Sequence, residues 1–126
     1  MELTKKRIRP AFKDERGAIF DLLDKEKIFH IGMLTSKKGS IRGNHYHKKA
    51  KQITYVLSGK IELITKNAEQ KDAKPYSLIM EKGDIVDIPP MVCHSIKALE
   101  ESTLLIFTDE QRGDGGYEDD THRVEM

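Results

Sequence analysis

The chain has 126 residues, with 22 basic and 21 acidic side chains, so its formal net charge is +1. This length is typical of one domain, which we expect to span residues 1–126, and the balanced charge argues against nucleic acid as a partner. The only cysteine, Cys93, excludes an internal disulfide framework and fits a reducing compartment. No apolar run approaches the roughly 18 residues of a membrane-spanning helix, so we predict a cytoplasmic protein without a membrane partner.

The local sequence predicts strands along the whole chain, and no window has a sustained helical period. The first, Ile8–Phe12, is expected at a sheet edge because Pro10 removes a backbone donor. Further apolar runs, separated by turns rich in glycine, proline or charge, are expected to form strands at Ala18–Leu23, Ile28–Thr35, Gln52–Leu57, Lys60–Thr65, Tyr76–Met80, Ile85–Ile88, His94–Ala98 and Thr103–Thr108. Many short strands of this kind indicate an all-β sandwich or closed barrel.

Ser58-Gly59 stands between two of these runs and predicts a tight β-hairpin. Alternation in the run before it places Gln52 and Val56 on one face of the strand and Ile53 and Tyr55 on the other. Both faces are therefore expected to be buried, one inside a barrel and one against a neighbouring segment. Tyr55 is expected to point away from the interior.

Four polar side chains have the pattern of a metal site. His45 and His47 are two residues apart, so in a strand both imidazoles point to one face. His94 shares a face with apolar Ile96, and a buried histidine needs a metal or a hydrogen-bond partner, because an unsatisfied polar group costs about 1–3 kcal/mol. With Gln52, this set is suited to a borderline transition metal, although an amide oxygen is a weaker ligand than a carboxylate. The alternative is a metal-free pocket that uses the same side chains for acid–base chemistry.

The segment from Gly39 to Gly59 resembles the first cupin motif, G-x5-H-x-H-x4-E-x6-G. His45 and His47 stand at its fixed positions, and Gln52 replaces its glutamate. The resemblance implies a double-stranded β-helix of the jelly-roll type, with a pocket inside the barrel.

A second segment resembles the other cupin motif, G-x5-P-x-G-x2-H-x3-N. Gly83, Pro89 and His94 match it, while Met91 replaces its internal glycine and Ala98 its asparagine. Taken with the first motif, this match makes the whole chain similar to a small cupin.

A finer resemblance concerns the run Arg42–His47, RGNHYH, which is similar to stretches of nucleotide-sugar epimerases. His45, His47, Lys48 and Gln52 also match the HxHKxxxQ pattern of dTDP-sugar 3,4-ketoisomerases. The C-terminal cupin domain of capsular-polysaccharide reductases carries an RGNHYH run and binds metal. These resemblances imply that His45 and His47 are catalytic and that Arg42 holds a nucleotide diphosphate; by itself, Arg42 is equally well a surface charge. The ketoisomerases generally lack a histidine at the position of His94 and work without metal.

The function expected is therefore that of a metal-binding cupin with isomerase or epimerase chemistry on a sugar or nucleotide-sugar, in surface-polysaccharide metabolism. The expected cofactor is a divalent transition metal such as zinc, iron, nickel, manganese or copper, held by His45, His47, Gln52 and His94. Two alternatives remain open: a dioxygenase-type cupin, and a non-enzymatic module that binds a metal or small ligand.

Several other segments are assigned ordinary roles. His30 and His122 are expected to be plain polar residues, and Cys93 a packed thiol. The segment Leu3–Phe12 is expected to pair with or cross onto a second subunit in a homodimer. The glycine-rich, acidic tail Gln111–Met126 is expected to be irregular and external, so that deleting residues 115–126 would cost little stability.

Overall fold

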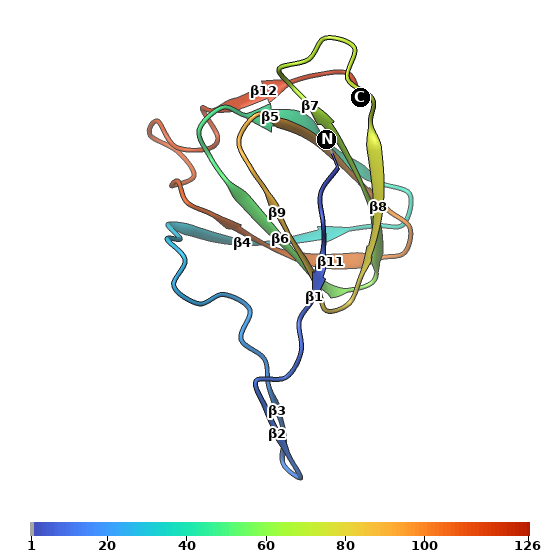
Figure 1. Ribbon diagram of the computed structural model, residues 1–126, viewed down its shortest axis with the longest axis vertical. Coiled ribbons are helices and arrows are strands. Elements are labelled where there is room, and N and C mark those ends of the chain that lie inside the picture. Colours follow the sequence, from blue (N-terminus) through green and yellow to red (C-terminus); the bar gives the residue numbers. More distant parts are fainter. Residues whose placement is uncertain (1) are drawn as a thin grey trace.

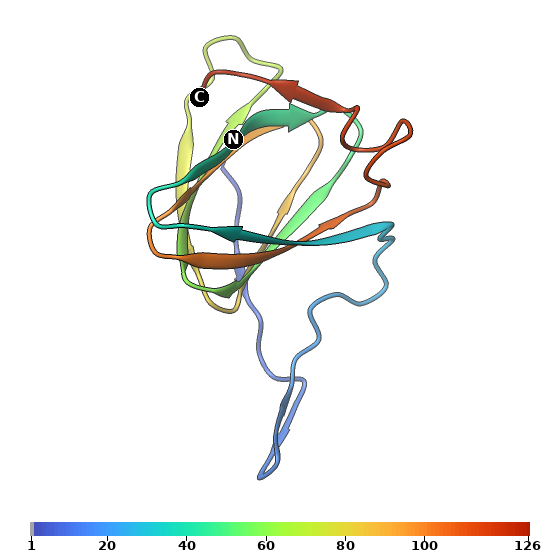
Figure 2. The same cartoon turned by 180° about the vertical axis from the view of Figure 1, so that it is seen from behind.

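Residues 2–126 of the computed structural model form strands, turns and loops and no helix. Accordingly, no helix within these residues is long and apolar enough to cross a membrane. Two five-stranded antiparallel sheets make up the body of the protein, and a short hairpin stands away from it (Figures 1 and 2). The predicted all-β cupin jelly-roll is confirmed.

The first sheet has the order β1–β9–β6–β11–β4 and the second the order β12–β5–β10–β7–β8. The strands of the first sheet are β1 (Lys6–Arg7), β9 (Asp84–Ile88), β6 (Gln52–Ser58), β11 (Ser102–Thr108) and β4 (His30–Ser36). Those of the second are β12 (Thr121–Arg123), β5 (Ile41–His47), β10 (Val92–Ala98), β7 (Lys60–Asn67) and β8 (Tyr76–Glu81). The separate hairpin consists of β2 (Phe12–Asp14) and β3 (Gly17–Ile19).

A hydrophobic core joins the inner faces of the two sheets. Its buried members come from both sheets: Val56, Ile61, Leu63, Met80, Val86, Ile88, Val92, Ile96 and Leu104. Burying a side chain of this size stabilises the fold by roughly 1.5–3 kcal/mol. These inward positions also fix which polar side chains of the same strands face the interior, since side chains alternate along a strand.

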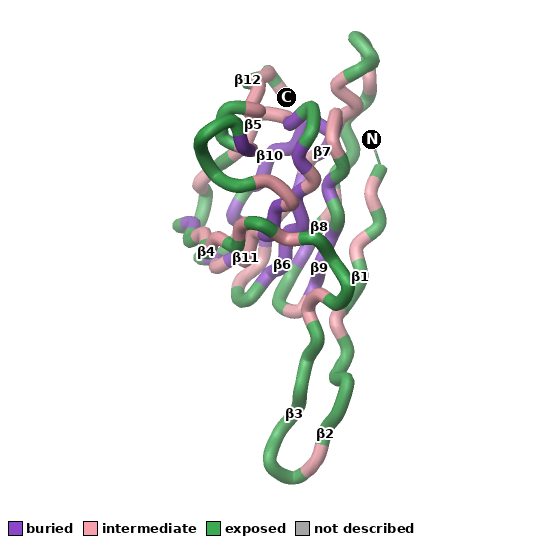
Figure 3. The backbone as a smooth tube through the Cα atoms, turned by 90° about the vertical axis from the view of Figure 1, so that its left-hand side faces the viewer, coloured by how far each residue is buried: buried purple, intermediate pink, exposed green. Residues whose placement is uncertain are grey.

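A second apolar cluster lies on the other face of the first sheet. Ile53, Tyr55, Ile85 and Phe107 are buried there beneath apolar residues of the segment that follows β3, including Leu22, Leu23 and Ile28. Strand β6 is therefore buried on both faces, as its alternation predicts (Figure 3). Tyr55 belongs to the outer cluster, so its side chain points away from the interior. Cys93 is a buried free thiol, as expected, and burial raises its pKa.

The predicted hairpin at Ser58-Gly59 is wrong, because β6 and β7 belong to different sheets. Gly59 carries the chain around the corner between them with a φ of +89°, and a Cβ there would collide with Ser102 and with the Glu101 carbonyl. A left-handed glycine suits both a hairpin and a corner. The local sequence does not distinguish the two.

Two predicted strand boundaries in the N-terminal region also fail. Ile8–Phe12 is not a strand: β1 ends at Arg7 and β2 begins at Phe12, with Pro10 in the gap. The strand predicted at Ala18–Leu23 ends at Ile19, and Leu22 and Leu23 instead pack on the outer face of the first sheet. The apolar residues there cover the outer face of the first sheet and do not pair as a strand.

Candidate functional site

Three of the four predicted ligands meet inside the barrel. His45 and His47 project from one face of β5, and β10 pairs with β5 so that His94 lies opposite His45. The imidazole centroids of His94 and His45 are 4.6 Å apart. The centroid of His47 lies 5.0 Å from that of His45 and 5.5 Å from that of His94. One ring nitrogen of each histidine lies within 4.8 Å of the others, which is close enough for a single ion to touch all three.

Backbone carbonyls fix the tautomers of two of these rings. Nδ1 of His94 lies 3.1 Å from the Val92 carbonyl oxygen, and Nδ1 of His47 lies 3.2 Å from that of Asp120. A carbonyl oxygen only accepts, so both Nδ1 atoms carry the proton and both Nε2 atoms carry a lone pair. This is the second-sphere arrangement usual for metal-ligating histidines.

The lone pairs that remain have no partner among the described residues. Nε2 of His47, Nε2 of His94 and Nδ1 of His45 are buried and make no hydrogen bond within residues 2–126. Buried polar atoms without a partner are rare in folded proteins. Three of them aimed at one small region fit a shared ligand, either a metal ion or a polar group of a small molecule.

Burial keeps the imidazoles of His45 and His94 neutral at physiological pH. Desolvation, followed by the charges of His47 and Arg123, lowers the pKa of His45 to about 4. Desolvation, followed by the charge of His45, lowers the pKa of His94 to about 3. Neutral rings are the form that binds metal, and protons compete weakly with a metal at such nitrogens.

Gln52, the fourth predicted ligand, enters from the opposite sheet. It is the first residue of β6, it is buried, and it lines the same pocket as the three histidines. Its Nε2 lies 3.4 Å from Thr54 Oγ1, a long hydrogen bond that leaves the amide oxygen for another partner.

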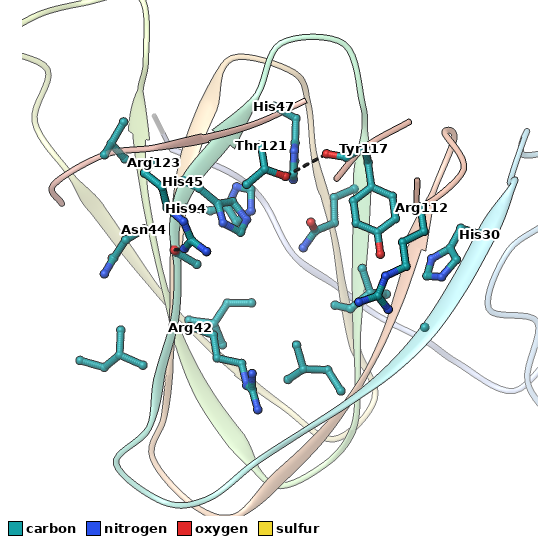
Figure 4. A pocket seen from close by; sticks show the side chains of 18 of the residues that line it. His30, Arg42, Asn44, His45, His47, His94, Arg112, Tyr117, Thr121 and Arg123 are labelled. Carbon is teal, nitrogen blue, oxygen red and sulfur yellow. Dashed lines mark hydrogen bonds between the residues drawn. The ribbon is translucent and has the colours of Figure 1, made fainter. Parts of the chain in front are cut away.

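The pocket that contains these groups has a volume of about 920 Å³. Arg42, Arg112 and Arg123 line it, and within the described chain no aspartate or glutamate does. Figure 4 shows the three imidazoles together, with Arg42 nearer β4 and Arg112 on the far side of Tyr117. Cationic walls without acids favour an anionic ligand.

Arg42 is held at the pocket wall by its neighbours. Its Nε donates to Ser36 Oγ and its Nη2 to the Thr35 carbonyl oxygen, each at 3.0 Å. These bonds orient the guanidinium toward β4 and leave other N–H groups available. Arg42 is exposed and lines the pocket, a position that fits both of its interpretations, a surface charge and an anion clamp.

The tail is mostly irregular and adds no side chain to the hydrophobic core, as predicted, but it is docked on the barrel by one short strand. Residues 111–126, here called the C-terminal strap, include β12, which pairs with β5 in the register Thr121 to His47 and Arg123 to His45. The strap also supplies Arg112 and Tyr117 to the pocket wall. Its polar composition conceals this role, because backbone hydrogen bonds rather than apolar burial dock it.

His30, expected to be an ordinary polar residue, also lines the pocket. Its ring centroid lies 5.2 Å from that of Tyr117 of the strap, with the two ring planes tilted by 51°. Its buried Nδ1 has no hydrogen-bond partner within residues 2–126. Strand parity could have found it, because His30, Gly32 and Leu34 alternate with exposed Ile31 and Met33. His122 is ordinary, as expected: it points away from the site and contacts Tyr46 and Asp120.

Comparison with known families agrees with this geometry. The model of the polysaccharide biosynthesis C-terminal domain matches residues 12–114. The chain belongs to this family. A comparison with curated proteins gives no match.

Solved structures similar to this polysaccharide biosynthesis domain are sugar-nucleotide enzymes, as the sequence resemblance predicts. A 3,4-ketoisomerase from Helicobacter canadensis superposes with a TM-score of 0.79 at 18% identity, covering 98% of this chain and 91% of its own. A sugar 3,4-ketoisomerase from Thermoanaerobacterium thermosaccharolyticum, solved with TDP, gives 0.74 at 22% identity, covering 96% and 87%. A 3'-monoepimerase from Streptomyces bikiniensis, solved with dTDP-quinovose, gives 0.81 at 13% identity, covering 98% and 69%. At these identities the likeness establishes a shared fold.

The family match also separates the barrel from most of the strap. It ends at residue 114, before β12 begins at Thr121. All four predicted ligands and Arg42 lie inside the matched region, whereas Tyr117 and Arg123 lie beyond it. In this polysaccharide biosynthesis domain the pocket is therefore completed by residues outside the family pattern.

Proposed function

We propose that this protein is a metal-binding cupin that catalyses isomerase- or epimerase-type proton transfer on a nucleotide-sugar in surface-polysaccharide biosynthesis. The observation that carries the proposal is the buried cluster of His45, His47 and His94, with a free ring nitrogen on each, inside a pocket walled by arginines. The family assignment and the TDP-bound structures of similar fold support the choice of substrate class.

Isomerisation of a keto sugar removes a proton from the carbon next to the carbonyl and returns one to another carbon. The arginines of the pocket suit the diphosphate, because a guanidinium pairs with two phosphate oxygens at once. In a pocket without metal, an imidazole of the cluster is then the proton carrier nearest to a sugar bound beside it, whereas an ion on the free ring nitrogens would take these rings out of that role. Tyr55 takes no part, since it packs on the outer face of the first sheet.

The residues present also fit a divalent transition metal. His45, His47 and His94 would hold it, with the Gln52 oxygen as a further donor, and a bound ion would supply Lewis-acid stabilisation of the enolate. Imidazole donors favour zinc, iron, nickel or copper over magnesium and calcium, and manganese is accommodated less readily. The low pKa values of His45 and His94 favour this use, because such nitrogens are weak bases.

Metal content tests the cofactor. We expect about one equivalent of metal in tag-free protein incubated with zinc or iron, and far less in His47→Ala and His94→Ala. Tyr76→Ala is the control, because that exposed side chain of β8 lies outside the pocket and the variant should retain full stoichiometry. Sub-stoichiometric metal in the wild type would exclude the proposed metal cofactor and leave His45 and His47 as acid–base groups.

Solvent exchange tests turnover independently of the metal. Incubation with a dTDP-4-keto-6-deoxy sugar in D2O should replace hydrogen by deuterium on the carbon next to the carbonyl, as seen by proton NMR. Exchange that survives complete removal of metal supports the acid–base pocket. Stoichiometric metal without exchange on any keto-sugar nucleotide would instead identify a non-enzymatic binding module.

We also propose a homodimer, formed through the β2–β3 hairpin. The hairpin projects from the barrel (Figures 1 and 3), and its apolar side chains Phe12 and Ile19 are exposed. Ile31 and Met33 of β4 are exposed beside the outer cluster of the first sheet, opposite Phe107 and Leu105 of β11. These two apolar surfaces suit each other across two copies of the chain.

The expectation that Leu3–Phe12 pairs with a second subunit is wrong, since Lys6–Arg7 pairs with β9 of its own chain and Leu3 and Ile8 pack on its own apolar clusters. Sedimentation velocity at micromolar concentration should give a dimer for the wild type and a monomer for the double variant Phe12→Ser, Ile19→Ser. Ile79→Ser, at an exposed apolar position on β8, is the control and should remain dimeric. A monomeric wild type would remove this proposal.

A further inference from the structure

One residue of the C-terminal strap, Asp120, contacts the segment around His47 at four points. Its carboxylate accepts hydrogen bonds from the backbone N–H groups of Lys48 at 3.0 Å, Lys49 at 2.8 Å and Ala50 at 3.0 Å. Its own carbonyl oxygen accepts from His47 Nδ1 at 3.2 Å. The side chain has 12% of its surface exposed, while its donors Lys48 and Lys49 lie at the surface.

His47 and His94 are oriented from different sources. The carbonyl that receives Nδ1–H of His94 belongs to Val92, two residues earlier on the same strand, so the barrel alone sets that ring. The carbonyl that receives Nδ1–H of His47 lies 73 residues away in the chain, on the strap. Only the strap therefore holds His47 in the tautomer that leaves Nε2 free toward the other histidines.

The carboxylate of Asp120 is what places its carbonyl. Three successive N–H groups converge on it and fix the strap against the turn that follows β5. On its C-terminal side, the strap is fastened by Arg123 Nη1 to the Gly43 carbonyl at 3.0 Å and by the Val124 N–H to the Asn44 carbonyl at 2.9 Å. On its N-terminal side, Gly116, Tyr117 and Glu118 bond to residues 111–113, within the strap itself. Asp120 is thus the first hydrogen-bonded anchor to the barrel after that self-bonded stretch, in which only the ring of Tyr117 touches the barrel, at His30 and His47.

We propose that Asp120 is a positioning residue for His47, and that the C-terminal strap is a working part of the histidine site. Loss of the carboxylate frees residue 120, its carbonyl leaves Nδ1 of His47, and the ring then samples the tautomer that puts a proton on Nε2. By reciprocity, a ligand bound at Nε2 of His47 stabilises the docked strap. This consequence rests on the proposed function, whereas the effect on His47 in the ligand-free protein does not.

The ligand-free protein supplies the first test. Nitrogen-15 NMR of the imidazoles should show one Nδ1–H tautomer for His47 in the wild type and a mixture in Asp120→Ala. Amide exchange at Lys48, Lys49 and Ala50 should become at least about tenfold faster, because their acceptor is gone. A purely structural role elsewhere in the fold would not change the tautomer of this one ring.

Asp119→Ala is the matched control. Its carboxylate accepts from the Gly115 N–H at 2.7 Å inside the strap, so the variant should retain the wild-type tautomer and exchange rates. Asp120→Asn keeps the size of the side chain and one acceptor oxygen, so it should restore part of the tautomer preference. If Asp120→Ala does not fold, Asp120→Asn decides the question alone, with a partial change expected. Wild-type tautomer and exchange in the folded Asp120 variants would overturn the proposal.

Zinc affinity supplies the second test. Removal of a second-sphere partner typically lowers metal affinity about 10–100-fold, so Asp120→Ala should fall in this range while Asp119→Ala stays within about twofold. Zinc should also slow tryptic cleavage after Arg112 in the wild type. If neither the wild type nor the variants bind zinc, the proposed metal cofactor is excluded. The tautomer and amide-exchange data still decide the role of Asp120.

Discussion

Lowering the pH should destabilise the metal-free protein through His94. Burial, reinforced by His45, lowers its pKa to about 3, whereas a histidine of the unfolded chain has a pKa of about 6.5. Below pH 6.5 the unfolded state therefore binds a proton that the native state does not, and the free energy of unfolding falls as the pH falls toward 3. At about 1.4 kcal/mol per pH unit, His94 alone accounts for a loss of about 2 kcal/mol between pH 8 and pH 5.

Urea denaturation of wild type and His94→Gln at pH 8, 7, 6 and 5, with chelator present, measures this effect. Titrating groups far from His94 cancel in the difference between the two free energies of unfolding, and His45→Gln introduced into both proteins removes the coupled neighbour, whose ring lies 4.6 Å away. From pH 8 to pH 5 the free energy of unfolding of the wild type should fall by about 2 kcal/mol more than that of His94→Gln. His122→Gln serves as the surface-histidine control. A wild-type-minus-His94→Gln difference that is constant with pH would refute the reasoning.

Further changes test the site and the fold. Gln52→Glu should tighten zinc binding about tenfold or more, measured by competition with a chromophoric chelator, because a carboxylate is a stronger and charged donor; unchanged affinity would place Gln52 outside the ligand set. Deletion of residues 115–126 should cost at least about 3 kcal/mol, or roughly 10 °C in Tm by calorimetry, because it removes β12 and the Asp120 anchor; a loss below about 1 kcal/mol would show that the strap is not structural. Asp84→Ala should cost about 3 kcal/mol in urea denaturation, since its buried carboxylate holds Lys5 and Arg7 of the N-terminal segment at 3.0 and 3.2 Å; a nearly neutral effect would mean that these ion pairs do not hold β1 in place.

Strand parity was the strongest source of correct prediction. The spacing of His45 and His47 places both on one face, and the apolar Ile96 identifies the inward face of β10 that also carries His94. That the two faces meet follows from the cupin resemblance and not from either strand alone. The antiparallel register that sets His94 opposite His45 is a long-range feature, and only the structure supplies it.

The failures share a physical cause, which is that backbone pairing depends little on local composition. Gly59 satisfies the conformational demand of a hairpin and of a corner equally well, and the choice is made by strands β9, β10 and β11 elsewhere in the chain. The glycine-rich, acidic composition of the strap gives no sign that it docks on the barrel. Its docking instead uses the edge of β5 and one carboxylate, Asp120, which looks in the sequence like the other acids around it.

The charge of the pocket gives a physical reason for Gln52 at the position where the cupin motif has glutamate. Three neutral imidazoles and an amide would leave the full charge of a divalent ion uncompensated, beside a wall that contains Arg42, Arg112 and Arg123 and no acid among the described residues. Such a site is short of negative charge, and an anionic ligand would supply it. A glutamate at position 52 would bind the ion more tightly but would offset part of that deficit and repel the anion at close range. The glutamine thus favours a site in which metal and anionic substrate bind better together than either does alone.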